Sequence, residues 1–203
     1  MEKENCLNKR MYEISKIAEI IEIILISVGI FLVPILIPLM SSTVFGSSSF
    51  IANNSRYIVG VIVNTALIIA AVNVKGWKKI VGLITLPSIS AILGGVILNT
   101  SSIYTVCMIP AIWIGNFTMV YLFRKLLVEK RLNYVIVSAV SVISKVALIF
   151  AGFNLLTATN VIPKASEVAK ILSMSMGINQ LITATVGSVM AFGIIKLIYS
   201  KSK

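Results

Sequence analysis

The distribution of basic residues constrains the fold of this chain more than any other feature of its sequence. Long apolar stretches alternate with loops that are either rich in lysine and arginine or nearly free of them. One set of segments holds 14 basic residues and the alternate set holds three. Lysine and arginine are retained on the cytoplasmic side of membrane proteins. The pattern therefore predicts six membrane crossings, with both termini in the cytoplasm.

The two sets of basic residues follow the order of the apolar stretches. The cytoplasmic set is Lys3, Lys9, Arg10, Lys16, Lys75, Lys78, Lys79, Arg124, Lys125, Lys130, Arg131, Lys196, Lys201 and Lys203. The outer set is Arg56, Lys164 and Lys170. The one remaining basic residue, Lys145, lies inside an apolar stretch.

The apolar stretches are long enough to cross a membrane, which requires about 20 residues of helix. We predict an all-α, polytopic membrane protein that forms a single domain over residues 1–203. The predicted transmembrane helices are Ile23–Met40, Tyr57–Val74, Ile80–Leu98, Tyr104–Phe123, Tyr134–Leu156 and Met174–Ile195.

Two segments outside these helices allow alternative interpretations. Met11–Glu22 carries charges three and four residues apart, which can pair along one helix face. It is either a solvated extension of the first helix or an interfacial helix that docks a cytoplasmic partner. Ser41–Arg56 is polar and rich in serine and asparagine. It is either a mobile connector or a lid over a site that faces outward.

Composition supports the membrane assignment and excludes several functions. The chain is 58% hydrophobic and 12% charged, whereas soluble domains carry about 25% charged residues. A net charge of +11 could indicate a nucleic-acid-binding protein. However, the basic residues lie at helix ends, as contacts to anionic lipid would, and do not form one basic face. We expect a multi-pass protein of the cell membrane that contacts anionic lipid and no nucleic acid.

Few side chains are available for catalysis or for metal binding. The chain has no histidine, and its two cysteines, Cys6 and Cys107, fall on a tail and inside a helix. A zinc, haem or iron–sulfur centre therefore lacks its usual ligands. We predict no cofactor, no metal and no enzymatic activity. There is also no nucleotide-binding motif, so any ATPase would have to be a separate chain.

Polar residues inside predicted spans are the best candidates for a binding site, because each is costly in lipid without a partner. Five of them come from four helices and share the outer to middle depth of the bundle: Asn64, Asn116, Lys145, Asn179 and Gln180. We predict that they line one cavity that opens to the outside. Trp113 and Phe117 would supply part of its apolar wall.

Lys145 is the most informative of the five, since no acidic residue lies at its predicted depth. Its ammonium group either meets an anionic ligand or has a structural role, in which the stem snorkels to the surface or the group bonds helix carbonyls freed near a proline. Each amide could likewise serve only to join two helices. Ala66 and Ala70, four residues apart, make a smooth surface for a partner or for internal packing.

Three stretches carry a resemblance to a known family. They are NTALIIAAVNVKGWKKIVGLITLPSISAILGG, MIPAIWIGNFTMVYLF and SMGINQLITATVGSVMAFGI. In these the chain resembles the substrate-binding S components of energy-coupling-factor (ECF) importers of vitamins and micronutrients. The last stretch is the most similar, with amides near the outer end of the sixth helix followed by small residues.

The resemblance implies a non-catalytic pocket that faces outward under the first outer loop, in a bacterial inner membrane. It also implies partners in trans, namely a transmembrane coupling subunit and two ATPases. The family docks its coupling subunit through an alanine-x-x-x-alanine motif on helix one. Here that spacing occurs on the second helix, at Ala66 and Ala70.

The leading hypothesis is therefore a substrate-capture subunit for a small polar or anionic micronutrient. A structural or accessory membrane protein without a small-molecule ligand is the alternative. A secondary transporter is disfavoured, because no carboxylate lies in the middle of a span and no internal repeat is evident.

Overall fold

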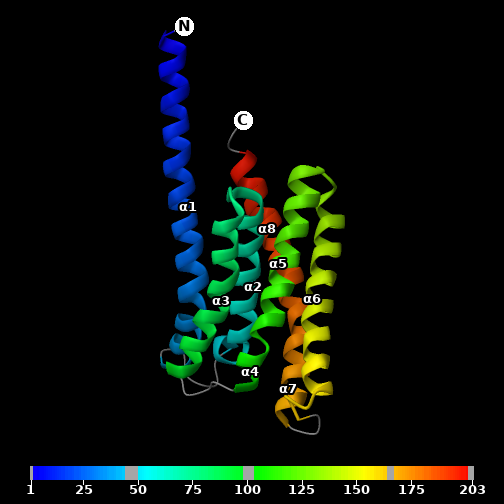
Figure 1. Ribbon diagram of the computed structural model, residues 1–203. Coiled ribbons are helices and arrows are strands. Elements are labelled where there is room, and N and C mark those ends of the chain that lie inside the picture. Colours follow the sequence, from blue (N-terminus) through cyan, green and yellow to red (C-terminus); the bar gives the residue numbers. More distant parts are fainter. Residues whose placement is uncertain (1, 44–49, 98–102, 164–166, 201–203) are drawn as a thin grey trace.

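The apolar stretches form helices that stand side by side in one bundle, shown in Figure 1. The computed structural model describes residues 2–43, 50–97, 103–163 and 167–200, and no strand occurs within these ranges. The helices are α1 (Glu2–Thr43), α2 (Phe50–Asn73), α3 (Trp77–Ile97), α4 (Ile103–Cys107), α5 (Ile109–Leu122), a π-helix η1 (Phe123–Glu129), α6 (Tyr134–Ala158), α7 (Glu167–Met176) and α8 (Ile178–Ser200).

Among the described residues, five helical segments are long and apolar enough to cross a membrane: Glu19–Met40, Asn54–Asn73, Ile109–Glu129, Tyr134–Ala158 and Ala169–Leu197. The chain thus has the architecture of a multi-pass membrane protein. The remaining predicted span, Ile80–Leu98, corresponds to the 21-residue helix α3, which is not one of the five. Six crossings therefore stay a prediction.

Both ends of the chain lie at the same end of the bundle. Figure 1 places the start of α1 and the end of α8 there, together with the α2–α3 turn and the connection from η1 to α6. We call this the terminal end. The shared position agrees with an even number of crossings, whereas the side of the membrane on which it lies stays a prediction.

The first helix is longer than its predicted span. α1 begins at Glu2, so Met11–Glu22 continues the same helix rather than forming a separate element. Figure 1 shows the N-terminal half of α1 extending beyond the rest of the bundle. No glycine or proline occurs before Gly29, so nothing in this half interrupts the helix.

The predicted outer loop Ser41–Arg56 is only partly non-helical. Residues 41–43 end α1, and Phe50–Arg56 form the first turns of α2. The loop prediction is therefore wrong for both ends of this segment, while residues 44–49 lie outside the described residues. Arg56 is exposed and Asn54 is half-buried, so polar residues here belong to the start of a helix. Polar composition alone does not distinguish such a helix start from a loop.

Two predicted spans are interrupted. Tyr104–Phe123 is divided at Met108 into α4 and α5, because Pro110 occupies the first turn of α5, where its missing N–H is tolerated. Met174–Ile195 is divided at Gly177 into α7 and α8. The backbone bends there without losing its bonds, since Gly177 N donates to Ser173 O at 3.0 Å.

Close approach between helices sets the position of the polar residues. A Cβ atom on Gly187 of α8 would lie 2.8 Å from Asn64 Cβ of α2, and one on Gly115 of α5 would lie 2.5 Å from Ile149 Cγ1 of α6. Only glycine fits at these two contacts. The apolar core around them includes Leu67, which is 1% exposed.

Candidate functional site

A short chain of hydrogen bonds crosses the bundle at its centre. Lys145 of α6 is 2% exposed, and its Nζ donates to Oδ1 of Asn64 on α2, which is equally buried. Asn64 Nδ2 in turn donates to Thr183 Oγ1 of α8 at 3.4 Å. These three side chains therefore join α6, α2 and α8 through polar contacts.

A second contact lies one to two turns further along α2 and α8, away from the terminal end. Tyr57 OH donates to Asn179 Oδ1 at 2.9 Å. Thr183 Oγ1 also donates to the carbonyl oxygen of Asn179 at 2.8 Å, which places the two contacts on one face of α8. The polar chain thus continues from Lys145 toward the predicted outer end of the bundle.

The spacing of residues on α2 and α8 explains this alignment. The two helices run in the same direction (Figure 1). Gly60 lies beside Thr183, and Asn64 lies beside Gly187, one turn further along both helices. Since each contact repeats after four residues, polar groups placed at this spacing on both helices meet at every turn.

Two buried polar atoms near Lys145 have no partner within the described part of the chain: Oδ1 of Asn116 and Oγ of Ser141. Asn116 is 3% exposed, and its neighbour Gly115 packs against the Lys145 backbone, since a Cβ there would lie 3.0 Å from the Lys145 carbonyl oxygen. Ser141 is fully buried and precedes Lys145 by one turn of α6. Buried polar groups nearly always have partners, so unpartnered ones mark a place where a ligand or water can bind.

The charge of Lys145 is not balanced by a nearby carboxylate. The ion pairs between described residues are Lys79–Glu19 and Lys125–Glu129, and neither includes Lys145. Within the part of the chain that the structure describes, its one hydrogen-bonding partner is a neutral amide, although an ammonium group can donate three bonds. An anion placed here would gain a charge-assisted hydrogen bond in surroundings of low polarity.

The five predicted site residues have different environments. Lys145, Asn64 and Asn179 belong to the hydrogen-bonded chain, and Asn116 follows Gly115 of α5, which packs against the Lys145 backbone. Gln180 is half-buried and contributes its backbone carbonyl, which accepts from Thr183 Oγ1 at 3.3 Å. The depth of these residues in a membrane and a role in ligand binding stay predictions.

Two residues that we predicted to form the apolar wall of the cavity, Trp113 and Phe117, lie away from the polar cluster. Trp113 is 37% exposed and Phe117 is 41% exposed, on the outer surface of α5. Phe117 directly follows the inward-facing Asn116 and is rotated by about 100° from it, whereas Trp113, three residues before Asn116, lies about 60° to the other side. The prediction that these rings line the site with Asn116 is therefore wrong.

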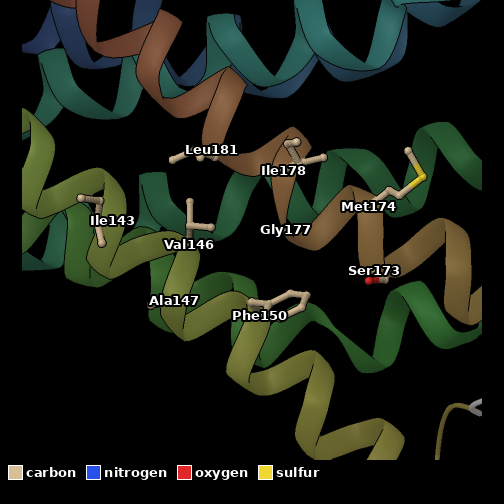
Figure 2. Close-up of a pocket in the computed structure, with 9 residues that line it drawn as sticks. All are labelled: Ile143, Val146, Ala147, Phe150, Ser173, Met174, Gly177, Ile178 and Leu181. Atoms are coloured by element: carbon tan, nitrogen blue, oxygen red, sulfur yellow. The ribbon is translucent and has the colours of Figure 1, made fainter.

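Apolar clefts lie on another face, between α6 and the helices α7 and α8. Figure 2 shows the first, of about 550 Å³, in which Phe150 and Met174 lie on either side of the bend at Gly177. The second, of about 440 Å³, lies closer to the terminal end, where Tyr134 and Phe192 form part of its lining. Neither cleft is lined by any of the five predicted residues. A cavity common to all five therefore stays a prediction.

Ala66 and Ala70 pack inside the chain. Ala70 is 1% exposed, and Ala66 packs against the same apolar core. This arrangement corresponds to the internal-packing alternative for such small residues, because a partner could reach Ala70 only if the core opened. Their assignment as a docking surface stays a prediction.

Sequence reasoning did not select three residues that complete the polar cluster: Tyr57, Thr183 and Ser141. Tyr57 is read from sequence as an interfacial ring, and threonine and serine are common in membrane helices, where they bond their own backbone. A signal was nevertheless available. Thr183 follows Asn179 by four residues, and Ser141 precedes Lys145 by four, so each shares a helix face with a selected residue.

The sequence matches no protein-family model, no curated protein and no solved structure. Among the described residues there is also no group of three or more histidine, cysteine, aspartate or glutamate side chains that could hold a metal ion. What the site can do must therefore follow from its own chemistry. It offers one buried ammonium group, two amides, and hydroxyl groups from three helices.

Proposed function

We propose that the chain is a substrate-capture subunit of an importer of the energy-coupling-factor type, and that it binds a small polar or anionic micronutrient in the centre of the bundle. One observation carries the proposal. The ammonium group of Lys145 is buried and bonded to a neutral amide, with the unpartnered oxygen of Asn116 at a similar depth. A ligand carboxylate or phosphate would supply the missing negative charge.

The neighbouring groups give the ligand an orientation. An anionic oxygen would accept from Lys145 Nζ, in competition with Asn64 Oδ1. A donor group on the ligand would meet Asn116 Oδ1, which has no partner among the described residues. Such a site favours a molecule with an acid and a donor on one small skeleton, because both ends are then satisfied.

Delivery of the ligand would require partners in trans. A transmembrane coupling subunit and ATPase subunits would supply the energy, and the proposed arrangement keeps both termini of this chain on the ATPase side. The terminal end carries the basic α2–α3 turn and the connection after η1, as expected for a cytoplasmic face.

The test begins with the protein purified from membranes in mild detergent. Denaturation should release one small anion in near-stoichiometric amount, which mass spectrometry would identify. Co-expression with candidate coupling subunits should yield a complex that survives purification. Absence of any bound molecule, together with failure to form a complex with every coupling subunit tried, would contradict the proposal.

A structural role without a ligand is the second candidate, favoured by the bond between Lys145 and Asn64. A pair that serves only to hold α6 and α2 together needs no further partner. In that case, the double variant Lys145→Met with Asn64→Leu should stay folded with little change in stability, because replacing both members of a buried polar pair by apolar groups is often nearly neutral. No small molecule would be released from the wild-type protein.

A further inference from the structure

Aromatic rings and basic groups meet on the surface of the terminal end, where α3 begins beside the last turns of α5. The Trp77 ring centroid lies 5.7 Å from that of Phe117 and 5.8 Å from that of Tyr121. All three rings are between 38% and 41% exposed. Together they form an aromatic column that runs from the terminal end toward the middle of the membrane.

A guanidinium group closes the terminal end of this column. Arg124 Cζ lies 5.4 Å from the Trp77 ring centroid, and Arg124 Nη1 donates to the Val74 carbonyl oxygen at 2.6 Å. The second contact fixes the guanidinium group in place, since it ties η1 to the α2–α3 turn. A guanidinium group has five donors, so most of its capacity is left for an acceptor outside the chain.

The charge at this turn is positive and only partly balanced. Glu19 of α1 accepts from Lys79 Nζ at 3.0 Å, and Glu22 accepts from Asn73 Nδ2 at 2.6 Å. The exposed Lys78 and the half-buried Arg124 take part in none of the ion pairs between described residues. Lys78 and Arg124 therefore have no ion-pair partner within the described ranges.

We propose that this surface binds one anionic phospholipid, with the headgroup phosphate between Arg124 and Lys78 and the start of one acyl chain along the aromatic column. Charge complementarity selects an anionic headgroup over a zwitterionic one. Tryptophan and tyrosine favour this depth, because their rings contact both the apolar chains and the headgroups. Val81 of α3, which is 45% exposed, continues the apolar surface from Trp77 deeper into the membrane.

The chain offers a direct reporter, because Trp77 and Trp113 are its two tryptophans. In a Trp113→Phe variant, all tryptophan fluorescence comes from Trp77. The protein would be reconstituted in phosphatidylcholine nanodiscs with increasing fractions of phosphatidylglycerol brominated near the headgroup end of its acyl chains. Bromine quenches only at close range, so quenching reports lipid at the column.

Brominated phosphatidylglycerol should quench Trp77 at a lower fraction than brominated phosphatidylcholine does. Each basic side chain involved should contribute a factor of about 5 to this preference for phosphatidylglycerol over phosphatidylcholine. Lys78→Gln and Arg124→Gln should each reduce it by that factor, and the double variant should abolish it. Lys196→Gln, an exposed lysine on α8, is the matched control and should leave it unchanged. High salt should weaken the preference.

If Arg124→Gln disturbs the α2–α3 turn, Lys78→Gln still tests the proposal, because Lys78 is exposed. Inorganic phosphate should not relieve the quenching, because it lacks the acyl chain that contacts the column. Equal quenching by the two brominated lipids would overturn the proposal, and it is the result expected if this surface instead contacts another protein. Relief of quenching by inorganic phosphate would also overturn it, because the site would then bind a free anion.

Discussion

Substitution of Gly187 by alanine tests whether α2 and α8 approach as closely as the polar chain requires. The added methyl group would lie 2.8 Å from Asn64 Cβ and 3.0 Å from the Val61 carbonyl oxygen. Both neighbours are close to the backbone and cannot turn away. The two helices must therefore separate by several tenths of an ångström, which also strains the bond from Thr65 Oγ1 to the Gly187 carbonyl oxygen, now 3.1 Å.

The same helix supplies a matched control. Gly193 has no heavy atom within 4 Å of the position that a Cβ would occupy. Gly193→Ala should therefore gain only the helical preference of alanine over glycine, about 1 kcal/mol. Gly187→Ala gains the same preference but also overpacks the helix contact, at a cost of about 1–3 kcal/mol. Gly187→Ala should thus be less stable than Gly193→Ala by about 1–3 kcal/mol.

The measurement is the free energy of unfolding in mixed micelles, with sodium dodecyl sulfate as denaturant and circular dichroism as signal. Gly187→Ala should also lose bound small molecule, because Asn64 is displaced from Lys145. If the two variants unfold at the same denaturant fraction, α2 and α8 do not pack through Gly187, and the position of Asn64 described above would be refuted.

Further substitutions test other parts of the polar cluster. Tyr57→Phe removes the 2.9 Å bond to Asn179 and should lower the free energy of unfolding by about 0.6 kcal/mol, the average for such bonds in membranes; no change would show that the bond is not formed. Ser141→Ala removes a buried, unpartnered hydroxyl and should stabilise the ligand-free protein by about 1 kcal/mol. In contrast, Ser188→Ala breaks the 2.7 Å bond from Ser138 and should destabilise it. Equal effects of the two serine variants would contradict the assignment of partners. Sites near both termini should react with an impermeant label from the same side of the membrane. Reaction from opposite sides would exclude the proposed topology.

Much of the fold could be predicted from the sequence, because hydropathy and charge each act over whole segments. The start of α6 at Tyr134 agrees with the predicted span, since Asn133 accepts from the Val135 N–H and caps the helix. The breaks at Met108 and Gly177 could not be placed in the same way. A proline or glycine permits a break in a membrane helix, but neighbouring helices decide whether it occurs, and α1 continues through Pro34 and Pro38.

The site could be predicted only in part. Lys145 and Asn64 can be selected from the sequence because a polar side chain is costly in lipid, and the structure joins them by a hydrogen bond. Their orientation depends on which helices are neighbours, and sequence periodicity does not fix this. Trp113 illustrates the difference, because it is three residues from the buried Asn116 but its own side chain is exposed.

The most direct test is the affinity of the released small anion for ligand-free protein and its lysine variants. Lys145→Met should bind it about 10- to 100-fold more weakly, because a charge-assisted hydrogen bond in a buried site is lost. Lys196→Met, which removes an exposed lysine from α8, should bind with unchanged affinity. Equal affinity of both variants and the wild-type protein would contradict the claim that the buried ammonium group holds the ligand.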